Sequence, residues 1–142
     1  MENEIFQALL QIVNYFNDPR FDQRIIAAAG LTPSPNLLPI IVRVGTAGQL
    51  NVSDLARQLG KDYSSVSRQV TKFEQTGLLA THPDPADKRA RQITLTAEGT
   101  AIFQRIGQAR ADVLQTALAP LSAADQKQIL TSLQMIAKLL GR

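Results

Sequence analysis

The feature that most constrains this fold is a pair of short helix patterns joined by a tight turn. The first pattern opens at Asn51 and Asp54, which resemble a capping box, and it stops at Gly60. The second runs from Ser64 to about Gln75. Only the residues Gly-Lys-Asp-Tyr separate the two. Two short helices around such a turn predict a helix-turn-helix.

The second helix of this pair has one apolar face and one polar face. On a helical wheel, Val66, Val70 and Phe73 fall within about 40° of one another, and Asp62 or Ser64 caps the helix. The opposite side offers short hydroxyl side chains and basic groups, which suit phosphates and base edges in the major groove of DNA. The alternative is an ordinary solvated helix face. The predicted contact residues are Ser64, Ser65, Ser67, Arg68, Thr71 and Lys72.

A charged hairpin is predicted after this helix. Residues 79–82 and 92–95 are short strand candidates, and the loop between them is polar and rich in proline. A basic loop of this kind can reach a minor groove, although alone it is more often a solvated turn. Asp87 is near enough to Arg89 to hold the loop or the guanidinium in position. The predicted wing residues are Asp87, Lys88, Arg89 and Arg91.

Charge is concentrated in this middle segment. The 142 residues have a net charge of +3, and residues 57–91 hold seven basic and four acidic side chains, so they account for that whole excess. The absence of cysteine excludes disulfides, thiolate zinc sites and thiol-based sensing. With a single histidine as well, we expect neither a metal site nor a cofactor.

Helices are predicted before the helix-turn-helix. The first ends at Asp18, and a weaker one covers Phe21 to Ala29. A third is expected to have Ser34 as its N-cap with proline at its first position. Pro39 lies inside this third pattern and predicts either a kink or a late start.

Two further helices are predicted at the end of the chain. Thr96 is a fitting N-cap for a long helix that reaches Pro120, and Ser122 opens the last one. The first and last helices have apolar stripes that need either a partner surface or burial within the monomer. The predicted dimerisation residues are Ile5, Phe6, Leu9, Val13, Phe16, Ile129, Leu133, Ile136 and Leu140.

Residues 51–99 resemble the winged helix-turn-helix of the multiple antibiotic resistance regulator (MarR) family. The landmarks are the Ser-Val-Ser-Arg opening of the second helix, the Gly-Leu-Leu after it, and the Asp-Lys-Arg of the loop. The resemblance implies a mainly helical fold with a small β-hairpin wing, in which residues 1–33 and 100–142 dimerise and residues 34–99 bind DNA. It also implies that Arg89 enters the minor groove with Asp87 as its positioning partner.

The resulting hypothesis is a cytoplasmic, homodimeric regulator of transcription that binds a near-palindromic operator. By resemblance it is a repressor that a small-molecule effector relieves. The alternative is a winged-helix module that binds protein without DNA specificity. An enzyme is disfavoured, because no histidine, cysteine or phosphate-binding glycine loop accompanies the acids of the predicted wing. No apolar run is long enough to predict a membrane span.

Overall fold

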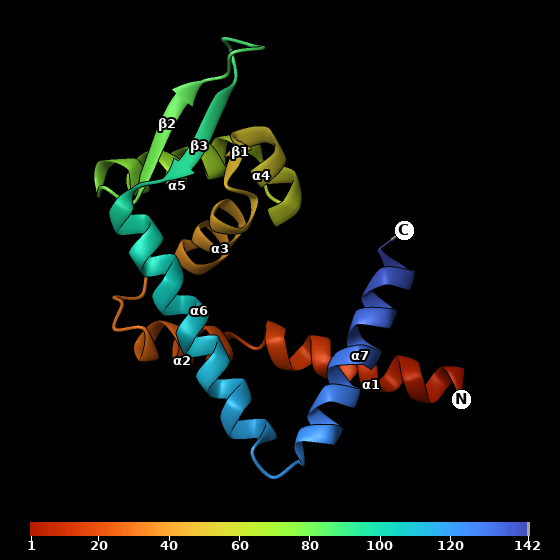
Figure 1. The fold of residues 1–142 in the computed structure, drawn as a ribbon. Helices are drawn as coiled ribbons and strands as arrows, with labels where there is room; N and C mark the ends of the chain where they lie inside the picture. Colours follow the sequence, from red (N-terminus) through yellow and green to blue (C-terminus); the bar gives the residue numbers. More distant parts are fainter. Residues whose placement is uncertain (142) are drawn as a thin grey trace. The chain divides into compact units, whose positions relative to one another are not determined.

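The computed structural model describes residues 1–141, and helices account for most of them (Figure 1). The chain divides into two compact units: Met1–Ala109, and a smaller unit that begins at Arg110. A three-stranded antiparallel sheet belongs to the first unit. This is the mainly helical fold with a small β wing that the sequence predicted. No helix in the described part of the chain is long and apolar enough to cross a membrane.

The core of the first unit forms where three helices meet the sheet. The helices are α3 (Leu37–Ala47), α4 (Val52–Leu59) and α5 (Tyr63–Gln75). Each turns its apolar stripe inward, as the helical periodicity of the sequence predicts. The largest fully buried side chains are Ile25, Ile40, Ile41, Val44, Val52, Leu55, Val66, Val70, Leu79, Ile93 and Ile106.

The sheet has the strand order β1-β3-β2. Strands β2 (Leu79–Pro83) and β3 (Arg91–Leu95) form the predicted hairpin, and its tip extends away from the helices (Figure 1). Strand β1 (Gln49–Asn51) pairs with β3 and was not predicted. It has only three residues, too few to show an alternating pattern, and it exists because β3 offers a free edge.

Two predicted helix starts were wrong. Helix α1 (Glu2–Asn17) ends as expected, but α2 (Pro19–Ala28) begins two residues before the predicted Phe21. Proline suits a helix start because it has no main-chain N–H that would be left without a partner there. The Asp18 carboxylate caps the helix by accepting a hydrogen bond from the main-chain N–H of Arg20 at 2.9 Å.

Helix α3 begins at Leu37, and its N-cap is Asn36 instead of the predicted Ser34. Asn36 has a φ of 61°, which asparagine tolerates better than most residues. Pro39 therefore lies in the first turn of the helix, where a missing N–H costs no helical hydrogen bond. The late start, one of the two expected consequences of Pro39, is confirmed.

Helix α6 (Ala97–Leu118) is attached to the start of the hairpin. The Thr96 hydroxyl donates to the Gly77 carbonyl at 2.6 Å and accepts the Gly99 N–H at 3.0 Å. A Cβ at Gly99 would collide with the carbonyl oxygen of Leu78, so this close approach requires glycine. Thr96 is thus the predicted N-cap and also a tie to the residues that precede β2.

The first and last helices differ from the rest in their burial. Neither α1 nor α7 (Ala123–Leu140) contains a buried residue. Phe6 is 63% exposed, Val13 is 50% exposed and Leu133 is 44% exposed. Ser122 caps α7 as predicted, by accepting the Asp125 N–H. The predicted dimerisation stripes are therefore mostly solvent-exposed in the single chain.

Candidate nucleic-acid interface

The N-terminus of α5 is organised by Asp62. One carboxylate oxygen accepts the main-chain N–H of Ser65 at 2.9 Å, and the other accepts the Ser65 hydroxyl at 2.8 Å. The main-chain hydrogen bond from Ser65, followed by its hydroxyl, lowers the pKa of Asp62. Of the two predicted caps, Asp62 is the one that the structure uses. The Ser65 hydroxyl also accepts a long contact of 3.4 Å from the Arg68 guanidinium.

The faces of α5 follow the predicted wheel. Val66, Val70 and Phe73 are buried. Ser64, Arg68 and Lys72 are exposed, while Ser65, Ser67 and Thr71 are half-buried. The helix therefore presents a hydroxyl and two cations to solvent, with the other three candidate residues along the margin of that face.

The tip of the hairpin is shaped by two aspartates that bond to the loop itself. The Asp84 carboxylate accepts the Ala86 N–H and the Gln92 amide, both at 2.8 Å. The main-chain bond from Ala86 is the largest cause of the lowered pKa of Asp84. Asp87 accepts the main-chain N–H of Arg89 at 3.0 Å. Sequence reasoning identified Asp87 but missed Asp84 as a support of the loop, although Asp84 bonds to an N–H two residues later just as Asp87 does.

A hollow joins the hairpin tip to the starts of α4 and α5. It has a volume of about 270 Å³, and its lining includes Ser53 of α4, Tyr63 of α5 and Arg89 of the hairpin. Tyr63 is 47% exposed there. Its lining thus combines hydroxyl and guanidinium donors, which can bind a backbone phosphate, with the carboxylate of Asp87. Three of the predicted wing residues, Asp87, Arg89 and Arg91, line this hollow, whereas none of the six predicted recognition-helix residues does.

A second group of contacts ties the hairpin to the C-terminal half of α5. One Glu74 oxygen accepts the Thr81 hydroxyl at 2.9 Å, and the other pairs with the Arg91 guanidinium at 2.9 Å. The same guanidinium nitrogen donates to the Thr81 hydroxyl at 3.3 Å. We call Glu74, Thr81 and Arg91 the clamp. Arg91 was predicted as a DNA contact, and its guanidinium is engaged here by Glu74.

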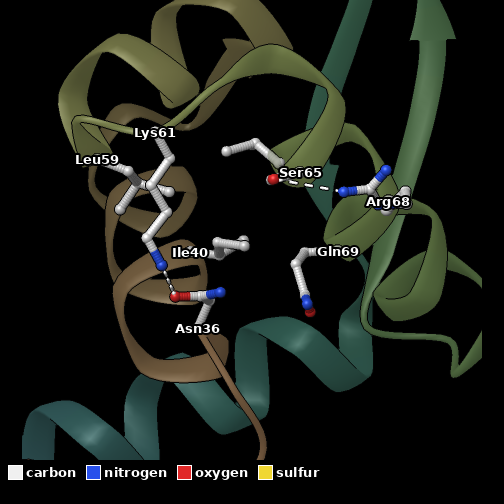
Figure 2. A pocket seen from close by; sticks show the side chains of 8 residues that line it. Asn36, Ile40, Leu59, Lys61, Ser65, Arg68 and Gln69 are labelled. Atoms are coloured by element: carbon white, nitrogen blue, oxygen red, sulfur yellow. Dashed lines mark hydrogen bonds between the residues drawn. The ribbon is translucent and has the colours of Figure 1, made fainter.

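A separate pocket of about 270 Å³ lies between α3, the α4–α5 turn and α5 (Figure 2). Figure 2 shows Lys61 bonded to Asn36 on one side and Arg68 turned toward Ser65 on the other. The Oε1 atom of Gln69, which also lines this pocket, is buried and has no hydrogen-bond partner among the described residues. No local sequence pattern predicts this pocket, since its residues come from segments that are up to about 30 positions apart.

Metal chemistry has no support in the described residues. Within residues 1–141, no group of three or more histidine, cysteine, aspartate or glutamate side chains could hold an ion. The site combines hydrogen-bond donors and cations on a helix and a hairpin with four carboxylates that bond to neighbouring groups of the protein.

Comparison with known proteins agrees with this architecture. Residues 29–90 match the MarR family. The chain is 28% identical over 109 residues to the transcriptional activatory protein BadR of Rhodopseudomonas palustris. That alignment covers 76% of this chain and 61% of BadR, so this chain spans about three fifths of its relative.

Solved structures show the same fold. A MarR family protein from Bacillus stearothermophilus has a TM-score of 0.81 at 19% identity, with 100% of this chain and 99% of that chain covered. A mutant of Escherichia coli MarR has a TM-score of 0.73 at 21% identity, with coverage of 92% and 94%. PcaV from Streptomyces coelicolor, solved with its natural ligand, has a TM-score of 0.55 at 22% identity, with coverage of 94% and 89%. The family match over residues 29–90 and the shared fold make this chain similar to proteins of the MarR family.

Proposed function

We propose that this protein is a homodimeric, sequence-specific DNA-binding repressor that a small molecule releases from its operator. The observation that supports this most is the hollow between the hairpin and the two helix N-termini, which is lined by Ser53, Tyr63 and Arg89. A DNA phosphate seated in this hollow would bring the helix to the major groove and the hairpin to the groove beside it.

In this proposal, α5 reads the bases. Arg68 has the geometry to form two hydrogen bonds with guanine, whereas Lys72 acts as a point charge toward phosphate. Ser64, Ser67 and Thr71 provide short donors that approach base edges and phosphates. Ser65 contributes indirectly, because its hydroxyl is bonded to Asp62 and contacts Arg68.

The hairpin acts as the wing. Lys88 and Arg89 are exposed at its tip, and Arg89 would enter a minor groove, where narrow A·T-rich segments attract arginine. Asp87 supports this by fixing the main chain at Arg89. Arg91 lies at the base of the tip, where Glu74 holds its side chain.

The dimer is proposed to form through the terminal segments 1–33 and 100–142. Large apolar side chains on α1 and α7 are exposed in the single chain, and burying them against a second copy would remove them from water. Two copies of the region 34–99 would then face two operator half-sites.

Regulation by a small molecule is proposed from the relatives. PcaV, a structural neighbour, was solved with its natural ligand, and BadR is described as a transcriptional activatory protein. We propose repression with release by a ligand that changes the spacing of the two DNA-binding regions. Thiol oxidation is excluded as the trigger, because the sequence has no cysteine.

A binding selection with purified protein on random duplex DNA tests this function. We expect enrichment of a near-palindrome whose half-sites lie about 10 bp apart centre to centre, or a multiple of that distance. The Arg68→Ala variant serves as the control, and it should enrich a degraded motif. Recovery of no motif by the wild type would favour a protein-interaction module, and a single asymmetric motif would contradict the dimer. A reporter behind the selected site, with and without the protein, distinguishes repression from activation.

A further inference from the structure

We propose that Glu74 is a positioning residue that sets the orientation of the hairpin relative to α5, and through it the register between the two groove contacts. This inference rests on the proposed function. Glu74 touches no DNA in this scheme, because both of its oxygens are already bonded within the protein. It would influence specificity only through the clamp.

The clamp links three elements through one carboxylate. Thr81 belongs to β2, Arg91 belongs to β3 and Glu74 belongs to α5. Because Arg91 also donates to Thr81, each member contacts the other two. A closed triangle of this kind restrains rotation of the hairpin about the helix better than a single contact would.

The clamp lies close to the tip of the hairpin, so it can influence the position of the tip. Arg91 is paired with Pro83, which is the last pair of the hairpin ladder before the tip begins. Arg89, the proposed minor-groove residue, is two positions from Arg91. At the other end, the chain between α5 and β2 turns through Gly77 at a φ of 81°. The clamp therefore restrains the far end of a hairpin that is covalently attached at its near end.

The energetics favour orientation over stability as the role of the clamp. The Arg91 and Glu74 side chains are 33% and 38% exposed, and ion pairs at such exposure contribute little to the free energy of unfolding. Small interactions can still select one orientation when the alternatives are nearly equal in energy. The pairing also neutralises Glu74, whose uncompensated charge would repel a nearby phosphate.

The first arm of the test measures hairpin orientation without DNA. Because the sequence has no cysteine, spin labels can be placed at Gln58→Cys on α4 and Ala86→Cys on the tip, with labelled chains diluted into unlabelled ones. We expect Glu74→Met to broaden or shift the label-to-label distance distribution, and Glu74→Gln, which keeps an acceptor, to restore part of it. Glu98→Met removes an exposed glutamate outside the clamp and should leave the distribution unchanged. An unchanged distribution in Glu74→Met would overturn the proposal.

The second arm uses the selected operator with varied flanks. We expect Glu74→Met to lower operator affinity about tenfold, the low end for loss of one groove contact, and to remove the preference for A·T-rich flanks while the preference within the half-sites persists. Adding Arg89→Ala to Glu74→Met should then cost little more. Equal losses on operator and random DNA, or fully additive losses of the two changes, would overturn the positioning role.

The two arms separate failure of this inference from failure of the proposed function. If the wild type selects no operator, the proposed function fails, while the distance measurement still decides whether Glu74 holds the hairpin. If the wild type selects a palindrome and Glu74→Met behaves like the wild type in both arms, only the positioning role is lost. A fall in thermal midpoint alone, with distances and flank preference intact, would also refute it.

Discussion

The central region of the chain and its two end helices differ in how far their apolar side chains are buried. In residues 37–106, which we call the reader region, most large apolar side chains are buried within the same chain. In α1 and α7 the apolar stripes are as regular, yet no residue is buried. The same periodic pattern therefore specifies a self-contained core in one place and an unsatisfied surface in the other. A hydrophobic stripe indicates which face is covered, but it does not indicate by which chain.

The largest effect, on operator affinity, is expected from a charge placed on the apolar surface of the end helices. Phe6→Asp places a charge on the exposed stripe of α1 and should turn the proposed dimer into a monomer, because a charge is costly to bury in an apolar interface. Loss of the second half-site contact should weaken operator binding by about 10²- to 10⁴-fold. Sedimentation and operator titration measure both results. Gln7→Asp on the same helix is the control, and a Phe6→Asp variant that remains dimeric would disprove the role of this stripe.

A substitution in the core of the reader region should lower the free energy of unfolding of the single chain. Ile93 is fully buried on β3, and Ile93→Ala should lower the free energy of unfolding by about 2–5 kcal/mol through lost contacts and a cavity. Leu140→Ala, at a site 72% exposed in the single chain, is the matched comparison. Denaturant unfolding should show the Ile93 variant destabilised at every protein concentration. If the two variants lost stability equally, the contrast between the two regions would not hold.

Within the reader region, Arg68→Ala sharpens the distinction between reading bases and binding charge. We expect a loss of about 1–3 kcal/mol on the operator, with relaxed preference at one base pair, if Arg68 bonds to guanine. Lys72→Ala should instead weaken binding to operator and random DNA alike. Competition titrations with both DNAs give the two ratios. A loss for Arg68→Ala that is the same on both DNAs would remove it from base reading.

A smaller effect is expected from Arg89→Ala at the wing. Removing one groove cation should reduce the slope of log affinity against log salt by about 1 and lower the preference for A·T-rich flanks. Titrations at several salt concentrations measure this. Lys88→Ala, which removes the neighbouring exposed cation, should lower the salt slope without altering the flank preference. Unchanged binding by the Arg89 variant would eliminate the proposed minor-groove contact.

The smallest effect is expected when the pH is lowered, which should reduce the free energy of unfolding. Hydrogen bonds from Ser65 and Ala86 lower the folded-state pKa of Asp62 and Asp84, so both stabilise the fold above the unfolded pKa of about 3.9. That contribution is lost as pH falls through the folded-state pKa values. Asp62→Asn keeps a capping side chain and should flatten the pH dependence of stability in this window. Urea midpoints from pH 6 downward test it, and a dependence as steep as that of the wild type would contradict it.

Local sequence patterns were enough to predict the helices, the hairpin and the Thr96 and Ser122 caps, and to limit the cap of α5 to Asp62 or Ser64, because capping and periodicity are decided within a few residues. They could not predict β1, which depends on pairing with residues more than 40 positions later. The use of Asn36 in place of Ser34 as a cap also escaped them, since Lys61 bonds to the Asn36 side chain from a distant turn.

Contacts between residues distant in the sequence also escaped prediction at the candidate site. The helical wheel correctly separated the exposed Arg68 and Lys72 from the buried face of α5. It could not show that Glu74 engages Arg91, because 17 residues separate the two and no local signal connects them. Which residues touch DNA remains a prediction for the experiments above.

The arrangement of the hairpin tip also bears on how fast the protein finds DNA. Asp84 and Asp87 direct their carboxylates to the N–H groups of their own loop, while Lys88 and Arg89 are exposed. An approaching duplex would therefore meet two exposed cations beside carboxylates whose negative charge is partly offset by the N–H groups of the loop. Such an outward positive field accelerates diffusional encounter, so the tip should contribute to the association rate constant as well as to the lifetime of the complex.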